Sequence, residues 1–334
     1  MRILLALVAL FAFASCVSQR FASGEVDELI AVEIGGMTQW IAAHGDEAHL
    51  PVLLWLHGGP GAAQMPVARA FNRNLESEFI VIHWDQRGAG KSNPRDFDDS
   101  KMTVERFVED VHEVTRYLKQ RFGRERIYLL GHSWGSQIGI AAAHRYPDDY
   151  IAYIGVSQMV DGADAQVIAE HELRRRLEDR GRARELRRLD RLDGPPYRDH
   201  GDYVTFAKML DAMGMNMDVP MRRLAAAAIR SDLYSSGDLV RWLRGANRGS
   251  GPMWDETQAL ETLEFAPSVA VPCFFIMGEQ DFNTPAALVD RLLDRLESPH
   301  KELIVFEGAA HTPFFADPER FLSALRRIKK TTSS

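Results

Sequence analysis

Cysteine is scarce in this chain of 334 residues, which has only 2, Cys16 and Cys273. Two cysteines exclude a scaffold stapled by disulfides, and a chain of this length buries about three quarters of its surface without one. An excess of one charge is also missing, since 40 Lys and Arg stand against 47 Asp and Glu, a net charge of −7. This mildly acidic balance argues against a large nucleic-acid interface. Hydrophobic residues make up 46% and charged residues 26% of the chain, which excludes wholesale disorder.

The long apolar run of the sequence lies at its very start. Residues 3–13 are apolar and follow Arg2, a pattern that is typical of an export signal and too short to span a membrane comfortably. The tripeptide A-S-C at 14–16 resembles a bacterial lipobox, in which the cysteine is lipidated and becomes the first mature residue. We therefore expect residues 1–15 to be a lipoprotein signal peptide. The protein would reside in the bacterial cell envelope and contact the membrane only through a lipid on Cys16. The alternative is an ordinary signal peptide cut within this tripeptide, and a secreted protein.

Apolar segments that are typical of strands alternate with amphipathic segments in both ends of the remaining chain. Strands that are apolar throughout indicate a mostly parallel sheet covered by helices on both faces. Cys273 lies in such a segment, so we expect it to be an inert core residue. The predicted strands are 29–34, 37–43, 52–56, 79–84, 127–130, 151–156, 273–277 and 303–306, and the predicted helices are 104–118, 134–146, 285–296 and 318–329.

The alternation breaks between residues 158 and 264, where the pattern is helical. We expect one α/β core formed by residues 24–157 and 265–330, with residues 158–264 inserted as a helical cap. The cap includes a charge-dense stretch, 170–193, with nine Arg and seven Asp or Glu. Near-balanced signs favour a solvated helix pair with ion pairs between successive turns over an anion-binding patch.

The pentapeptide G-H-S-W-G at 131–135 carries the strongest chemical signal of the sequence. It fits the G-x-S-x-G turn, in which a serine sits between a strand and a helix with its hydroxyl exposed at the edge of a sheet. Here an apolar strand precedes the pentapeptide and a helical segment follows it, which is the context that this turn needs. We interpret Ser133 as a nucleophile rather than as part of a structural turn.

A serine hydroxyl needs a base, and the base needs a group to orient it. In hydrolases with this turn both partners follow the serine, the acid first and the histidine last. Asp281 follows the strand at 273–277, and His311 follows the strand at 303–306, so the same edge of the sheet should hold both. Asp281 could instead begin a helix, in which case Glu279 is the alternative acid. Other histidines lie in turns near strand ends before the serine, where we expect packing or hydrogen-bonding roles; these are His57, His83 and His132.

Hydrogen-bond donors for an oxyanion are expected on two loops. One donor is the backbone N–H of Trp134, directly after the serine. The other should come from the H-G-G-P-G segment at 57–61, whose glycines allow a close approach to a ligand. A further turn, D-Q-R-G at 85–88, could contact substrate, but we favour a role for Asp85 and Arg87 in bracing the loops at this edge.

Taken in order, these motifs resemble the proline iminopeptidase (prolyl aminopeptidase) family of α/β-hydrolases. The resemblance covers about residues 30–156 and 265–330. It implies an α/β-hydrolase fold, with a mostly parallel central sheet, helices on both faces and an inserted helical cap. It also implies a small peptide substrate that loses an N-terminal proline, without cofactor or metal. The residues that it implies are the catalytic Ser133, Asp281 and His311, and the oxyanion donors Gly59 and Trp134.

The sequence departs from the family in the cap, where the family binds the free amine of the substrate with acidic residues. This cap does not align with those motifs, so its acidic residues are candidates by composition only: Glu170, Glu172, Asp202, Asp211 and Asp255. The aminopeptidase hypothesis therefore competes with a carboxylesterase, lactonase or amidase that uses the same residues on another small acyl substrate. A binding protein that has lost the chemistry is a third hypothesis, weakened by the presence of all three catalytic residue types. The oligomeric state is not predicted.

Overall fold

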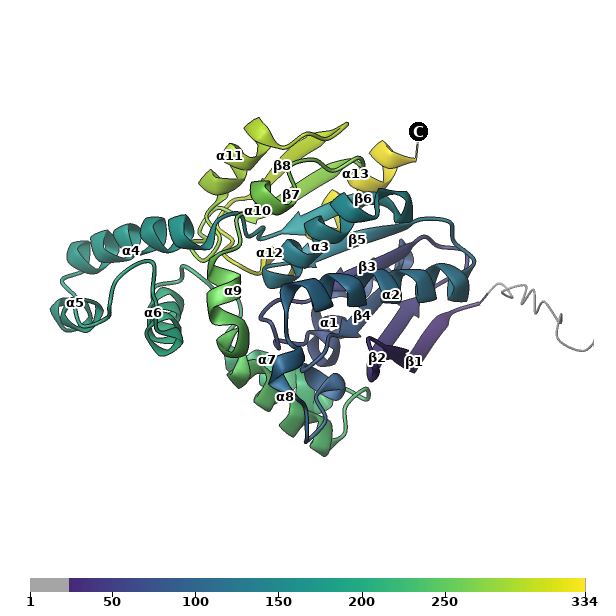
Figure 1. Ribbon diagram of the computed structural model, residues 1–334, viewed down its shortest axis with the longest axis horizontal. Coiled ribbons are helices and arrows are strands. Elements are labelled where there is room, and N and C mark those ends of the chain that lie inside the picture. The colour runs from purple at the N-terminus through teal and green to yellow at the C-terminus, as the bar shows by residue number, and fades with distance from the viewer. Residues whose placement is uncertain (1–23, 334) are drawn as a thin grey trace, which may run out of the picture.

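A computed structural model describes residues 24–333, so the predicted signal peptide and Cys16 lie outside the described residues. Eight strands form one sheet in the order β1-β2-β4-β3-β5-β6-β7-β8 (Figure 1). The first two strands and β4 pair antiparallel, and all other neighbours pair parallel. The strands are β1 (Val26–Ile34), β2 (Met37–Gly45), β3 (Val52–Leu56), β4 (Ile80–Asp85), β5 (Ile127–His132), β6 (Tyr150–Val156), β7 (Cys273–Gly278) and β8 (Lys301–Phe306).

The central strands are apolar because both faces of the sheet are covered. In β3, Leu54 belongs to the hydrophobic cluster on one face, and its neighbours Leu53 and Trp55 belong to the cluster on the other. Helices α2 and α3 contribute to the first cluster, and α1 and α13 contribute to the second. The central strands are therefore apolar on both sides because helices cover both faces of the sheet.

The helices of the core alternate with the parallel strands, as expected for crossover connections. None of the described helices is long and apolar enough to cross a membrane. The helices of the core are α1 (Met65–Asn72), α2 (Val104–Phe122), α3 (Trp134–Arg145), α11 (Ala286–Arg295), α12 (Pro313–Ala316) and α13 (Pro318–Thr332).

Seven further helices lie between β6 and β7 and form the helical cap. Figure 1 shows α4, α5 and α6 projecting to one side of the sheet, while α7 and α8 lie below its edge. The projecting helices have a small apolar core of their own, which includes Leu173, Tyr197 and Phe206. The cap helices are α4 (Gly162–Asp179), α5 (Ala183–Leu189), α6 (His200–Ala212), α7 (Met221–Arg230), α8 (Ser236–Arg248), α9 (Trp254–Gln258) and α10 (Thr262–Phe265).

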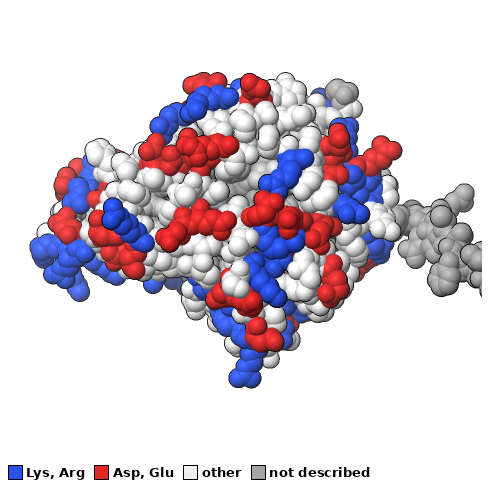
Figure 2. Space-filling view, in the orientation of Figure 1, with Lys and Arg blue, Asp and Glu red and all other residues white. Residues whose placement is uncertain are grey.

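The charge-dense stretch of the cap is laced with ion pairs. Arg174 lies 2.7 Å from Asp190, and Arg176 lies 2.6 Å from Glu172, one helical turn away. On the face seen in Figure 2, acidic and basic side chains lie next to one another over this part of the cap. The contacts favour the solvated helix pair over an anion-binding patch.

The expected fold class is confirmed: the chain has a mostly parallel sheet, helices on both faces and an inserted helical cap. Helices α1 and α12 were not predicted. They are 8 and 4 residues long, which is too short to show the helical periodicity on which the predicted helices rest. β8 begins two residues before its predicted start, because it includes the polar Lys301 and Glu302.

A buried ion pair ties the turn after β4 to helix α2. Nε and Nη2 of Arg87 lie 2.6 and 2.8 Å from the two carboxylate oxygens of Asp110, and both side chains are at most 1% exposed. Gln39 and Arg106 donate further hydrogen bonds to the same carboxylate. Arg87 thus has the bracing role favoured from the sequence.

We predict that Asp110→Ala lowers the free energy of unfolding by about 3–5 kcal/mol, because it leaves the Arg87 guanidinium buried without its partner. Urea denaturation measures the loss. The matched control is Glu109→Ala on the same helix, whose half-exposed carboxylate pairs with Arg106. Exposed pairs contribute about 0–1 kcal/mol. Equal losses in the two variants would contradict the bracing role.

Candidate active site

The turn between β5 and α3 holds Ser133 in a strained backbone conformation. Its φ is 53° and its ψ is −122°, a region that residues with a Cβ rarely occupy. The flanking glycines are required by space: a Cβ on Gly131 would overlap the carbonyl of Gly135, and a Cβ on Gly135 would overlap the carbonyl of Leu56. The turn thus places a polar side chain at the carboxyl end of a central strand.

Asp281 and His311 lie on the loops that follow β7 and β8, and they form a buried pair. Oδ2 of Asp281 lies 2.9 Å from Nδ1 of His311. The other oxygen of the carboxylate accepts the N–H groups of Asn283 and Thr284. The hydroxyl of Thr284 donates to Oδ2 at 2.7 Å. These bonds occupy the carboxylate and fix the plane of the imidazole. Glu279, the alternative acid, instead accepts the N–H of Gly308.

The two partners shift each other's pKa in opposite directions. Burial alone would raise the pKa of Asp281, but the charge and hydrogen bond of His311 outweigh it and lower the pKa below its ordinary 3.8. Burial alone would lower the pKa of His311, but the charge and hydrogen bond of Asp281, together with the charges of two further carboxylates, raise the pKa above 6.5. The pair therefore stabilises an imidazolium, which a general base must become.

The side chain of His132 joins the loop of Ser133 to the loop of His311. The carbonyl of His311 accepts hydrogen bonds from Nε2 of His132 and from the hydroxyl of Ser157, each at 2.9 Å. The rings of His132 and His311 lie 5.0 Å apart. The structure thus brings the residue before the serine into contact with the predicted base.

Sequence analysis missed Asn283, whose side chain forms a hydrogen bond with Nε2 of His311. Nδ2 of Asn283 lies 3.2 Å from Nε2 of His311, and Oδ1 of Asn283 accepts the hydroxyl of Tyr203 from α6. Within residues 24–333, Oγ of Ser133 forms no hydrogen bond with His311. An asparagine two residues after the acid carries no motif that could have marked it.

The predicted oxyanion loop passes directly against the serine turn. A Cβ on Gly58 would lie 3.1 Å from Cβ of Ser133, which shows how closely the two loops approach. Gly59 has a φ of 118°, and a Cβ there would lie 2.7 Å from the backbone N of Ala62. Trp134 is the first residue of α3, so its N–H belongs to the group of helix N-terminal donors without an intrahelical partner.

The other histidines near strand ends are buried and neutral. Burial lowers the pKa of His57 to about 4 and that of His83 and His132 to about 3. His57 accepts the N–H of Gln86 at 3.2 Å and His132 bonds to the His311 carbonyl. These contacts fit the packing and hydrogen-bonding roles that we expected.

Asp85 connects the core to the cap. Its Oδ2 accepts the N–H of Lys91 at 2.7 Å and the hydroxyl of Tyr234 from the segment before α8. Burial raises the pKa of Asp85 to about 7. The ammonium of Lys91 lies 2.8 Å from Asp238 of α8. Asp85 therefore braces this edge, as expected, by fastening α8 to it.

Four of the five acidic residues considered in the cap have intramolecular partners. Glu170 accepts the hydroxyl of Tyr197. Glu172 pairs with Arg175 and Arg176, whose hydrogen bonds and charges lower its pKa to about 2. Asp202 accepts the N–H of Asp193, and Asp211 accepts that of Met217. Asp211 is also close enough to His311 for its charge to raise the imidazole pKa. No hydrogen bond or ion pair of the Asp255 side chain occurs in the described part of the chain.

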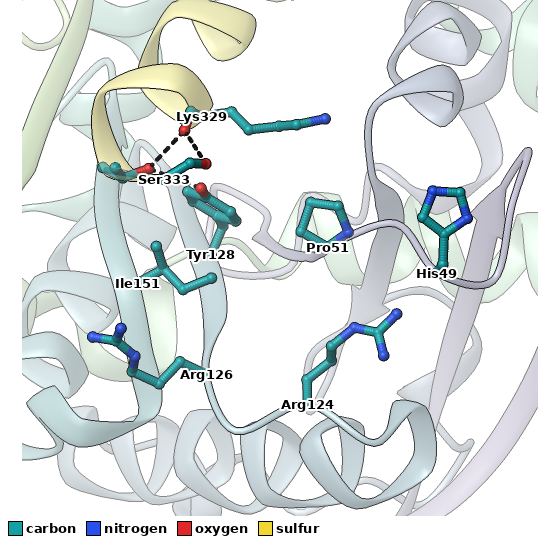
Figure 3. Close-up of a pocket in the computed structure, with 9 residues that line it drawn as sticks. His49, Pro51, Arg124, Arg126, Tyr128, Ile151, Lys329 and Ser333 are labelled. Atoms are coloured by element: carbon teal, nitrogen blue, oxygen red, sulfur yellow. Dashed lines mark hydrogen bonds between the residues drawn. The ribbon is translucent and has the colours of Figure 1, made fainter. Parts of the chain in front are cut away.

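A surface hollow lies at the opposite edge of the sheet, where the strands begin (Figure 3). Tyr128 near the start of β5, Ile151 near the start of β6 and Lys329 of α13 line it. Since Ser133, Asp281 and His311 follow the ends of their strands, this hollow is separate from them. Among the described residues, no cluster of three or more His, Cys, Asp or Glu is placed to hold a metal ion.

Comparisons with known proteins identify the family of this chain. The profile of the family described as "Serine aminopeptidase, S33" matches residues 51–319. This chain belongs to that family. A probable aminopeptidase of Bacillus subtilis, YbaC, is 31% identical to this S33 hydrolase over 300 residues, which are 89% of this chain and 94% of that protein.

More distant relatives share the architecture. A proline iminopeptidase of Saccharolobus solfataricus is 25% identical over 286 residues, 83% of this chain and 84% of that protein. The crystal structure of a proline iminopeptidase of Mycobacterium smegmatis superposes with a TM-score of 0.66 at 22% identity, covering 91% of this chain and 98% of that one. The resemblance predicted from the motifs is confirmed, and the S33 hydrolase is a serine hydrolase of the α/β-hydrolase superfamily.

We predict that Gly278→Ala in this S33 hydrolase lowers the free energy of unfolding by about 3 kcal/mol or more. A Cβ at the end of β7 would overlap the carbonyl oxygen of Ala310, and backbone cannot move aside as a side chain can. Thermal and urea unfolding measure the loss. The control is Gly237→Ala in α8, where the nearest atom would be 3.8 Å away, and which should be neutral or slightly stabilising. A stable Gly278→Ala variant would show that the loop of His311 is not packed as described.

Proposed function

We propose that this hydrolase is an aminopeptidase that releases an N-terminal proline, or another small residue, from small peptides. The observation that carries the proposal is the buried hydrogen bond between Asp281 and His311, on a loop bonded to the turn of the strained Ser133, in a chain of the S33 family. The names of the relatives point to the peptide substrate. The family and the geometry support acyl transfer at this edge of the sheet.

In the proposed mechanism, Nε2 of His311 takes the proton of Ser133 as the oxygen attacks the carbonyl carbon of the first residue. Asp281 stabilises the imidazolium that forms. The N–H groups of Gly59 and Trp134 hold the oxyanion of the tetrahedral intermediate. His311 then gives its proton to the leaving amine, the C–N bond breaks, and water hydrolyses the acyl-enzyme by the same sequence of steps.

Proton transfer requires one hydrogen bond of the structure to be exchanged. Nε2 of His311 pairs with Nδ2 of Asn283, and Ser133 must take that position or share it. The amide of Asn283 is in turn held by Tyr203 of the cap. Entry of a substrate between cap and core is a step at which this exchange could take place.

We predict that Ser133→Ala lowers kcat by about 10⁴–10⁶-fold and leaves the fold intact, because Ala removes only the nucleophile. A fluorophosphonate probe should label the wild-type protein and not the variant. Equal labelling of the two proteins would contradict the proposed nucleophile, and absence of labelling in both would favour a binding protein.

The substrate class is tested by blocking the amine. A prolyl arylamide should be hydrolysed and its N-acetyl derivative should not, because an acylated nitrogen cannot be protonated for recognition by acidic side chains. Plain esters of similar size serve as the comparison. If acetylated substrates or simple esters are processed as fast as prolyl arylamides, the protein is an esterase, lactonase or amidase rather than an aminopeptidase.

The pKa shift of His311 predicts the pH dependence of kcat/KM. A base must be unprotonated to act, and a raised pKa keeps the imidazole protonated to higher pH. The acidic limb of the profile should therefore have its midpoint above pH 6.5. Asp281→Asn should move the midpoint to lower pH, since it removes the charge that holds the proton, and lower kcat by about 10⁴-fold. A wild-type midpoint below 6.5 would argue against His311 as the base.

A further inference from the structure

The linker between α6 and α7 runs along the loops that carry Asp281 and His311. The carbonyl of Met215 accepts the N–H of Phe282, directly after the acid, at 3.0 Å. The carbonyl of Asn216 accepts the N–H of His311 itself at 2.7 Å. A segment of the cap is therefore bonded to His311 and to the residue that follows Asp281.

The carboxylate of Asp218 completes this contact on either side of the histidine. Its Oδ1 accepts the N–H of Ala310 at 2.6 Å, and its Oδ2 accepts the N–H of Thr312 at 2.7 Å. The hydroxyl of Thr312 also donates to Oδ2, at 2.9 Å. The linker thus accepts hydrogen bonds from three successive N–H groups, those of residues 310–312.

The linker is itself firmly anchored. The side chain of Met215 is fully buried in the small core of the projecting helices. Val219 is buried in the hydrophobic cluster to which α1 and α13 contribute. The N–H of Met217 donates to Asp211 at 3.0 Å, and that of Met215 donates to the carbonyl of Leu210. A segment fixed at both ends transmits its position to whatever it binds.

Charge adds to this geometry. The carboxylates whose charge raises the pKa of His311 are those of Asp281, Asp218 and Asp211, while burial lowers it. The ring of His132, which burial keeps neutral, lies with its centroid 5.0 Å from that of His311. Asp218 therefore acts on the base in two ways, through the backbone that carries the imidazole and through its field.

We propose that Asp218 is a positioning residue for His311, so that the cap is part of the support of the catalytic base. The inference rests on the proposed function, since it assumes that His311 is the base. Both oxygens of Asp218 are taken by three donors of residues 310 and 312, which leaves this carboxylate committed to the loop rather than to the amine of a substrate.

The test compares Asp218→Asn with Asp211→Asn in the full chain. In Asp218→Asn the new side-chain amide must point its NH₂ at an N–H of the loop, so the backbone of His311 shifts. A misplacement of about 1 Å costs on the order of 10²-fold in kcat. We expect such a loss in kcat, with KM within threefold of the wild-type value and a lower midpoint of the acidic limb. Labelling by a fluorophosphonate should slow by the same factor as kcat. Asp211→Asn removes a nearby charge but keeps an oxygen that can accept the N–H of Met217, and it should change kcat by less than about threefold.

A second pair of variants keeps the proposal testable if Asp218→Asn does not fold. Thr312→Val removes the hydroxyl, which donates to the carboxylate of Asp218 and accepts its backbone N–H, and it leaves the N–H of residue 312 in place. It should lower kcat and the pH midpoint in the same directions by a smaller factor. Thr312→Ser keeps the hydroxyl and should restore both. A general loss of stability would not produce this restoration together with a moved pH profile.

The possible outcomes separate the two proposals. A wild-type protein that no fluorophosphonate labels overturns the proposed function. Normal labelling of wild type together with an unchanged kcat and pH profile in Asp218→Asn overturns only the positioning role. A raised KM for prolyl arylamides at unchanged kcat would assign Asp218 to substrate binding and likewise overturn it.

Discussion

The hydrogen bond between Asp281 and His311 is the interaction on which the site depends. A carboxylate without solvent is costly to bury, and here its cost is offset by the imidazole of His311 and by N–H and hydroxyl donors from Asn283 and Thr284. The sheet makes this possible because β7 and β8 are parallel neighbours, so the loops after them leave the same edge side by side. The order of strands thus determines which residues can become a pair.

Much of this edge could be predicted from sequence because each signal is local. The glycines around Ser133 are needed by the turn that holds it, and Asp281 and His311 each follow an apolar strand. Because parallel strands end at the same edge of the sheet, the three residues are predicted to lie in one site. The same reasoning predicted the bracing role of Arg87 without revealing its partner, since Asp110 lies on a helix whose other carboxylates look no different in sequence.

The contacts made by the cap could not be predicted in this way. Asp218 meets Ala310 and Thr312 only because a linker without strand or helix periodicity is laid across the loop after β8. Asn283 and Tyr203 likewise become partners through the packing of α6 against the core. Composition could name acidic residues of the cap, but most of those chosen pair with neighbours on the cap itself, and the one bonded to the loop of the base was not among them.

The linker between α6 and α7 also limits how this protein can be recombined with its relatives. A chimera that exchanged everything between β6 and β7 would carry away the acceptors for three successive N–H groups of the core. The replacement would have to supply its own, at the same places. Grafting α4 and α5 alone leaves those acceptors in the chain, but the new helices must rebuild the small apolar core in which Met215 is buried.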